Sequence, residues 1–323
     1  MLRYILRRVL YSVPVLLVAS FLVYGGIRST YDPLSQYRHN PHIRNPQQII
    51  AERTTALGLN DPLVVQWWNW LRKFVSGDMG VSEHTHEQVS SMIWRALGPT
   101  LQLVFWVTLV SVILAVTIGV YSAVKQYSVG DYVLTGLSYL GIAMPTFWLA
   151  LLCMMVFGVK LGWLPISGIK SMEHDLLTAP MKVWDYSLHL VMPVLVAALT
   201  GLAGISRYMR SSMLEVVRQD YVTTARAKGL AERDVIYRHA LRNALLPVIT
   251  ILGLSLPGLI GGSVIFETIF AIPGMGRLFY DGVMMRDYPL VMGVLVIGAV
   301  LTLVGNLLAD ISYAIADPRL RRR

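Results

Sequence analysis

The sequence predicts an all-α integral membrane protein with six transmembrane helices, and two observations carry this prediction. Of its 323 residues, 55% are hydrophobic and 15% are charged, with a mean hydropathy of +0.55, whereas soluble domains average about 45–50% and about 25%. A helix needs roughly 20 apolar residues to cross hydrocarbon about 30 Å thick. The stretches that meet this requirement lie at about residues 9–27, 101–123, 132–157, 188–205, 245–266 and 290–309.

The first apolar stretch follows a basic flank of Arg3, Arg7 and Arg8, as the core of a signal peptide does. It is nevertheless long enough to span the bilayer, and residues 24–28 contain no Ala-x-Ala cleavage site. We therefore expect an uncleaved first helix, within a single transmembrane domain that occupies residues 1–323.

The charged residues predict the side of the membrane on which each connecting segment lies, because Lys and Arg collect on cytoplasmic segments. The N-terminus, the link at Lys125, the segment 207–242 and the tail from Asp317 onward together carry +10. The alternate segments, 28–98, 158–187 and 267–289, together carry zero. Both termini are therefore predicted to be cytoplasmic. The net charge of +9 then indicates sidedness rather than a nucleic-acid-binding surface.

Two of the connecting segments have a character of their own. Residues 28–98 form a long predicted extracytoplasmic loop with helical pieces at 46–58 and 61–75, and the second piece carries three tryptophans that suit a membrane interface. The predicted cytoplasmic segment 207–242 has apolar positions at helical spacing among many charges. It is an amphipathic pattern that is too polar to span and that breaks near Gly229.

Inside that cytoplasmic segment, residues 220–230 place small side chains at Thr224, Ala225 and Ala227 on a short helix that stops at Gly229. Small side chains let a helix lie close against a partner's groove, and a glycine at the end of a helix adopts positive φ to turn the chain. This geometry suits a short helix that docks on a partner protein and transmits its movement. On composition alone an ordinary solvated surface helix is the favoured interpretation, because runs of charged residues usually form solvated faces.

The segment 220–247, DYVTTARAKGLAERDVIYRHALRNALLP, resembles the cytoplasmic EAA loop of ABC importer permeases in the form typical of the dipeptide and oligopeptide family. Other segments resemble the B-type permease subunit of that family, in order along nearly the whole chain: Leu57–Pro62, Gly77–Ser82, Pro99–Leu103, Leu161–Pro165, Pro273–Leu278, Arg286–Pro289 and Asp317–Arg319. The chain departs from the general pattern at three places, with Thr223–Ala225 at the Glu-Ala-Ala position, Arg242 at the later proline, and Thr30–Pro33 at the usual Pro-Gly-Asp-Pro.

The resemblance implies a type I ABC importer permease fold and a multi-pass protein of the cytoplasmic membrane of a prokaryote. It implies a second homologous permease subunit, two ATP-binding subunits, an extracytoplasmic substrate-binding protein, and di- or oligopeptides as substrate. The loop would then couple ATPase closure to the spans by changing the balance between two conformations. The residues assigned to this coupling are Tyr221, Thr224, Ala225, Ala227, Lys228, Gly229, Leu230 and Ile236.

No catalytic residue and no cofactor is expected in this chain itself. A P-loop needs Gly-Lys followed by Ser or Thr to hold phosphates, and none of the lysines here follows a glycine. ATP and magnesium are therefore assigned to the partner ATPase subunits. His84 and His86 lack a nearby third ligand, so no metal site is predicted. The single cysteine, Cys153, excludes an intrachain disulfide.

The predicted fifth span is irregular, with Pro257, Gly258, Gly261 and Gly262 inside it, and Pro145 interrupts the third span. Proline removes a helix hydrogen bond and glycines allow close approach, so these five positions are the candidates for lining a translocation path. Tight helix packing through the Gly-x-x-x-Gly spacing remains an equal alternative.

Other functions stay open beside peptide import. A related permease for nickel or another small solute would share these motifs. A secondary transporter would be expected to show internal repeats and charged residues at the middle of the membrane. Within the limits given above the predicted spans contain no Asp, Glu, Lys or Arg, and Asp310 directly follows the last span, one helical turn after Asn306. A membrane-embedded hydrolase would need a nucleophile elbow of the Gly-x-Ser-x-Gly kind, which the sequence lacks.

Overall fold

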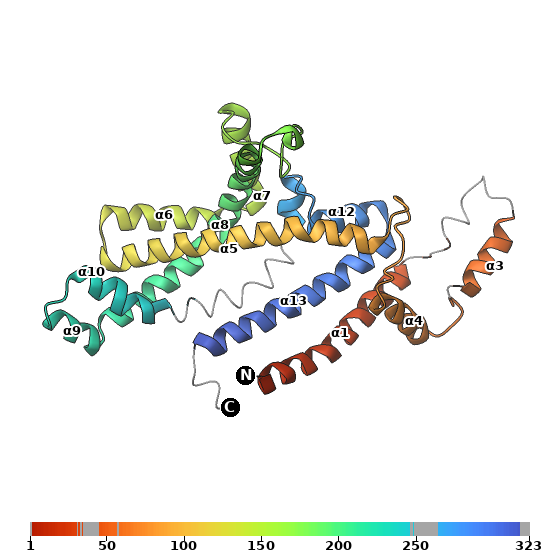
Figure 1. The fold of residues 1–323 in the computed structure, drawn as a ribbon, viewed down its shortest axis with the longest axis horizontal. Helices are drawn as coiled ribbons and strands as arrows, with labels where there is room; N and C mark the ends of the chain where they lie inside the picture. The colour runs from red at the N-terminus through yellow and green to blue at the C-terminus, as the bar shows by residue number, and fades with distance from the viewer. Residues whose placement is uncertain are drawn as a thin grey trace. The chain divides into compact units, whose positions relative to one another are not determined.

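The computed structural model describes residues 2–30, 32, 34, 45–56, 58–245, 248 and 264–316. Within these ranges the regular structure is helical (Figure 1), apart from an isolated antiparallel bridge between Val81 and Gln88. The chain forms two compact units. One contains Leu97–Arg277 with Met1–Ile5 and Leu301–Arg323, and the other contains Leu6–Ala96 with Leu278–Val300.

Among the residues that the structure describes, four helices are long and apolar enough to cross a membrane. They are α1 (Leu2–Thr30), α5 (Val89–Val124), α8 (Ala179–Val217) and α13 (Tyr288–Ala316). Each contains one of the predicted apolar stretches. The prediction of an all-helical membrane protein is confirmed to that extent. The count of six spans stays a prediction, because the stretch at 245–266 lies largely outside the described residues.

The predicted third span is not one straight helix. Helix α6 (Val129–Ala143) and the continuous pair α7 (Thr146–Cys153) and η1 (Met154–Lys160, a π-helix) meet at an angle of 110°, and together they have the length and apolarity of a fifth span. The bend has a local cause. Pro145 disfavours the helical conformation of the residue before it, and Met144 accordingly has φ −109° and ψ 137°.

Helix α8 is the centre of the unit that contains it. Gly141 of α6 lies so close to the backbone of Leu199 that an added Cβ would collide with the carbonyl group there. Small residues at such crossings let membrane helices approach closely. A cluster of buried side chains from α5, α7 and α8 packs around Phe270 and Ile272. Its other members are Leu103, Val107, Ala150, Leu190, Met192, Val194 and Val196.

In the other unit, helix α4 (Leu63–Val75) packs on α1, while α3 (Pro46–Ala56) precedes it in the chain. The indole nitrogen of Trp67 donates to the hydroxyl of Ser20 at 3.2 Å, and its ring meets Phe21 edge-on at 5.4 Å. Both helices fall on the two stretches for which helix was predicted. The interfacial position of the tryptophans stays a prediction, since no membrane is present.

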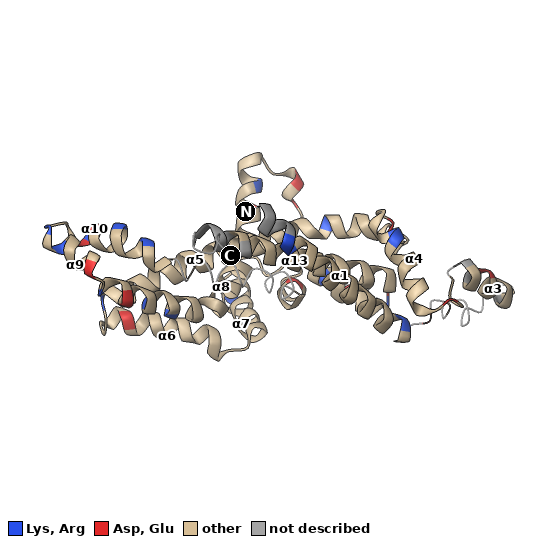
Figure 2. Cartoon of the chain, turned by 90° about the horizontal axis from the view of Figure 1, so that it is seen from below, with Lys and Arg blue, Asp and Glu red and all other residues tan. Residues whose placement is uncertain are grey.

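Charged side chains are sparse along the long helices and gather around α9 (Asp220–Ala227) and α10 (Glu232–Asp234), as Figure 2 shows. The π-helix η3 (Val235–Ala240) follows α10 directly. Two further helices matter for the sites below, the short 3-10 helix η2 (His174–Leu176) and α12 (Met275–Met285).

Candidate functional site

The segment assigned to coupling folds into a short helix that ends in a tight turn. Helix α9 ends at Ala227, and Gly229 follows with φ +75°. The amide of Gly229 donates to Arg226 at 2.9 Å and the amide of Leu230 donates to Ala225 at 3.4 Å. These two bonds form the Schellman pattern, in which a left-handed residue lets the chain satisfy the last carbonyls of the helix. The predicted stop at Gly229 therefore has a definite geometry.

One face of α9 is buried in the chain's own core. Val222 is fully buried and Ala225 is 6% exposed, and both pack with Val235 and Ile236 of η3. This cluster reaches into α5 and α8, and its other members are Val120, Met209, Met213, Ala240, Ala244 and Val248. The loop is thus fastened to the helical body by apolar packing.

The coupling role of the assigned residues stays a prediction, and burial divides them into two groups. The side chains of Ala225 and Ile236 are covered by this chain itself. The reason is the helical repeat, because Val222 and Ala225 are three residues apart and share the inward face. The remaining candidates are exposed: Tyr221, Thr224, Ala227, Lys228, Gly229 and Leu230.

An ion pair crosses the turn that follows α9. The guanidinium of Arg226 donates two hydrogen bonds to the carboxylate of Glu232, at 2.8 and 3.2 Å. This two-point contact lowers the pKa of the Glu232 carboxyl and raises that of Arg226. Both side chains are substantially exposed, so the pair fixes the direction of the turn more than it stabilises the fold.

Polar contacts also link the loop to α8 and onward to α6. The amide of Asn243 donates to the hydroxyl of Tyr221 at 2.8 Å, and the hydroxyl of Ser212 on α8 donates to the carbonyl of Ala244 at 2.9 Å. Further along α8, Arg210 pairs with Asp131 of α6 at 3.0 Å. The loop and these two helices therefore form a connected body.

A second polar cluster surrounds Glu267, whose side chain is fully buried. One carboxylate oxygen accepts the hydroxyl of Thr100 at 2.7 Å, and the other accepts the amides of Gly276 at 2.6 Å and Arg277 at 3.0 Å. The Thr100 oxygen itself accepts the amide of Met275 at 2.8 Å. A carboxylate placed on the first amides of α12 interacts favourably with the positive end of that helix.

The glycines of the segment Pro273–Leu278 follow from this cluster. A Cβ on Gly274 would collide with the Glu267 carboxylate, and a Cβ on Gly276 would lie 2.6 Å from the backbone of Val264. In the sequence this motif and Pro99–Leu103 were found separately and were not connected. The signal that could have connected them is Thr100 in one motif and Glu267 shortly before the other.

A similar contact joins two other motifs within the second unit. The hydroxyl of Ser82 donates to the buried carboxylate of Asp287, which also accepts the amide of Leu290 at 3.3 Å and so caps the start of α13. The Ser82 oxygen in turn accepts the amide of Thr85 at 3.0 Å. In both clusters the hydroxyl of a motif residue, Thr100 or Ser82, donates to an acidic side chain. That acidic side chain also accepts backbone amides at the N-terminus of a helix.

The candidate path residues are only partly placed. Pro145 lies at the bend between α6 and α7, whereas Pro257, Gly258, Gly261 and Gly262 lie outside the described residues. Their role in lining a path stays a prediction. Within the described part of the chain no group of three or more His, Cys, Asp and Glu is arranged to hold a metal ion.

Family models match nearly the whole chain. The model described as the inner membrane component of binding-protein-dependent transport systems matches residues 115–322, and that of the N-terminal part of such components matches residues 1–104. The chain belongs to this permease family. The resemblance drawn from the EAA loop and the other motifs is confirmed.

Curated relatives of this family match end to end. The chain is 43% identical to the oligopeptide transport system permease protein AppB of Bacillus subtilis, over 98% of both chains. It is 35% identical to the dipeptide transport system permease protein DppB of Alkalihalophilus pseudofirmus, over 99% of this chain and all of the other. It is 36% identical to the glutathione transport system permease protein GsiC of Salmonella choleraesuis, over 99% of both.

Solved structures support the permease fold. A chain of the MetNI methionine ABC transporter in inward-facing conformations superimposes with a TM-score of 0.54 at 15% identity. The match covers 70% of this chain and 96% of the other. At this identity the likeness concerns the fold alone.

Proposed function

We propose that this chain is the permease subunit of a binding-protein-dependent ABC importer that carries di- or oligopeptides across the cytoplasmic membrane. The observation that carries this proposal is the end-to-end match to relatives named as oligopeptide, dipeptide and glutathione permeases. Glutathione is itself a tripeptide, so these names share peptide chemistry. Nothing in the comparisons favours nickel or another small solute, or a secondary transporter.

In this proposal the chain forms half of the translocation path and the second permease subunit forms the other half. Two ATPase subunits bind ATP and magnesium, and a binding protein delivers peptide from outside. The exposed face of α9 and its turn contacts one ATPase. The buried face of α9 passes the resulting movement to α8, because Val222 and Ala225 belong to the same packed cluster as Met209 and Met213. Both termini lie in the cytoplasm.

The proposal is tested by uptake in cells that lack the chromosomal copy of this gene. Cells that express the chain with its partner subunits should accumulate a labelled peptide, and cells without the chain should not. Labelled nickel in parallel cultures tests the other solute class. Accumulation of nickel without peptide, at equal membrane levels, would overturn the substrate assignment and leave the permease assignment intact.

The assignment of ATP hydrolysis to partners has its own test. The purified chain alone should release no phosphate from ATP above the rate of an empty membrane preparation. The assembled complex should hydrolyse ATP. Turnover by the chain alone would contradict the division of labour.

A further inference from the structure

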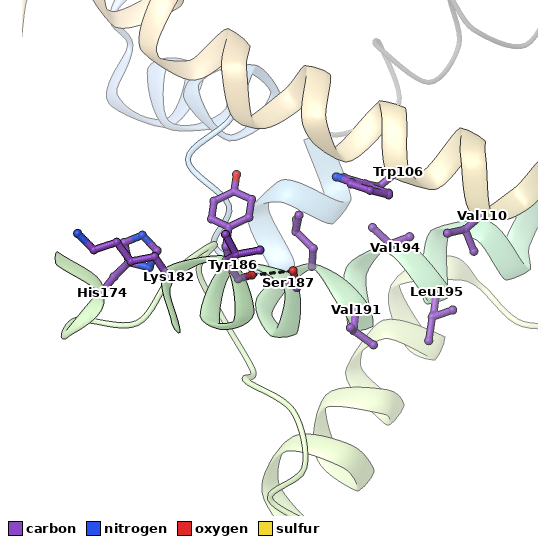
Figure 3. Close-up of a pocket in the computed structure, with 11 residues that line it drawn as sticks. Trp106, Val110, His174, Lys182, Tyr186, Ser187, Val191, Val194 and Leu195 are labelled. Atoms are coloured by element: carbon purple, nitrogen blue, oxygen red, sulfur yellow. Dashed lines mark hydrogen bonds between the residues drawn. The ribbon is translucent and has the colours of Figure 1, made fainter. Parts of the chain in front are cut away.

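A cavity of about 580 Å³ lies between α5 and the N-terminal half of α8 (Figure 3). Its lining is divided by polarity. His174 and Lys182 lie at one end, and Val110, Val194 and Leu195 lie at the other. The cavity thus has basic side chains at its mouth, with Asp185 bound to His174 and Asp175 near Lys182, and it is apolar along its length.

The dimensions of this cavity match one leaflet of a bilayer. From Lys182 to Leu195 helix α8 runs about 20 Å, of which the part beyond the predicted start of the span at residue 188 is about 10 Å. Half of the hydrocarbon core is about 15 Å thick. The apolar part of the cavity therefore reaches about two-thirds of the way through one leaflet, and Lys182 remains at headgroup level.

The polar groups of the cavity argue against a peptide as its occupant. An extended peptide carries an N–H and a C=O at every residue, and burying these against an apolar wall without partners is costly. The hydroxyl of Ser187 already donates to Val183 at 2.7 Å, and that of Tyr186 already donates to Gln102. Below these two residues the lining is aliphatic apart from Trp106. A peptide backbone would lose hydrogen bonds there.

A helix of a second permease chain would place only side chains into this open groove. The labelling experiment below distinguishes that occupant from a lipid. A hydrocarbon chain is far thinner and needs no hydrogen-bond partners.

The mouth of the cavity supplies a place for an anion. The Nδ1 atom of His174 is bound to Asp185 at 2.6 Å, which fixes the imidazole beside Lys182. A basic side chain at headgroup level attracts anionic lipid. We propose that this cavity is a binding site for an anionic phospholipid, with its phosphate at Lys182 and one acyl chain along the groove between α5 and α8.

The test uses the assembled importer in nanodiscs and a phosphatidylglycerol that carries a photoreactive group in the middle of one acyl chain. Illumination should label peptides of α5 and α8 around Trp106 and Leu195. The matched zwitterionic phosphatidylethanolamine probe should label them more weakly. Lys182→Gln should reduce phosphatidylglycerol labelling to the level of the phosphatidylethanolamine probe, because it removes the cation that would hold the phosphate.

Three variants serve as controls and alternatives. Lys182→Arg keeps the charge and should label as the parent does. Lys160→Gln removes the same charge from a lysine outside the cavity lining and should also label as the parent does. Val191→Trp fills the groove without touching the charge and should abolish labelling by both lipids.

Several outcomes would overturn the proposal. Equal labelling by the two lipids, unaffected by Lys182→Gln, would mean contact with bulk lipid only. Protection by saturating transported peptide would make the cavity part of the substrate path. Labelling that appears only when the second permease is left out would mean that this subunit covers the site. None of these results bears on whether the importer carries peptides, which uptake measures separately.

Discussion

Thr100 on α5 donates its hydroxyl to Glu267 across 2.7 Å, and the oxygen of the same hydroxyl accepts the amide of Met275 at the start of α12. One side chain therefore connects a long apolar helix, a fully buried carboxylate and the N-terminus of a third element. All donors around Glu267 converge on a carboxyl group that is fully buried, so each of them depends on the others.

The first prediction concerns that hydroxyl. Thr100→Val removes the donor at constant shape, and we expect a destabilisation of about 2 kcal/mol, because the carboxylate and the Met275 amide lose a buried partner. The apparent melting temperature of the purified complex is the measurement. Thr100→Ser keeps the hydroxyl and should behave as the parent. Thr108→Val is the matched control, since its hydroxyl donates to Val104 of the same helix at 2.7 Å. Equal melting for the variants at 100 and 108 would refute the network.

The second prediction concerns sidedness. In a Cys153→Ala background, His84→Cys should react with a membrane-impermeant maleimide in intact cells, because residue 84 lies in the predicted extracytoplasmic loop and is exposed. Lys228→Cys, also exposed, should react only after the membrane is breached. The reverse pattern would invert the charge-based topology.

The third prediction concerns pH and the turn after α9. The pKa of Glu232 is lowered below its usual 4.5 by the hydrogen bond from Arg226. A carboxyl with a lowered folded-state pKa stabilises above its unfolded pKa and loses that contribution as pH falls through the folded value. The mobility of a spin label at residue 230 should therefore stay constant across neutral pH and rise only below about 4.5.

Charge reversal tests the same pair at neutral pH. Arg226→Glu or Glu232→Arg alone should increase the label's mobility, and the double exchange should restore it. Failure of the exchange to restore order would mean that the turn is held by its backbone bonds alone.

A structural feature could be predicted from the sequence where the interactions that form it are local in the chain. The apolar length of α1, α5, α8 and α13 and the stop at Gly229 are properties of consecutive residues, so pattern and turn chemistry predicted them. Pro145 was noted as a break, yet the size of the bend was not. The helical repeat places Val222 and Ala225 on one face of α9, but it does not show that this face packs on α8. The hydrogen bond between Thr100 and Glu267 joins segments far apart in the chain, which periodicity does not record.

The fourth prediction separates the conformation of Gly229 from its surface. A side chain at this position meets open space, so only the positive φ opposes it. Asparagine tolerates this conformation and β-branched residues do not. Gly229→Asn should therefore retain ATPase association and peptide uptake, whereas Gly229→Val should lose both as the turn is strained. Gly229→Asp keeps the turn and adds a carboxylate, and should weaken association if the ATPase contacts this surface. The measurement is co-purification at matched membrane levels, and full association with Gly229→Asp would argue against the contact.

The last prediction uses two alanines on α9 that differ in burial. Ala225 is 6% exposed in a packed cluster, whereas Ala227 is exposed on the face assigned to the ATPase. Ala225→Leu adds three carbons to a filled core and should destabilise the loop by about 1–3 kcal/mol. The expected readout is a lower apparent melting temperature, even without ATPase subunits.

Ala227→Leu adds the same three carbons where the chain itself offers no obstruction, so melting should be unchanged. A close-packed partner tolerates added bulk poorly, and ATPase association and peptide uptake should therefore fall together. Ala231→Leu adds the same three carbons at an exposed position that lies beyond α9 and outside the assigned set, and it is the control for added surface apolarity. If Ala227→Leu binds the ATPase and transports as well as Ala231→Leu does, the exposed face of α9 is a solvated surface, and coupling must act through another part of the loop.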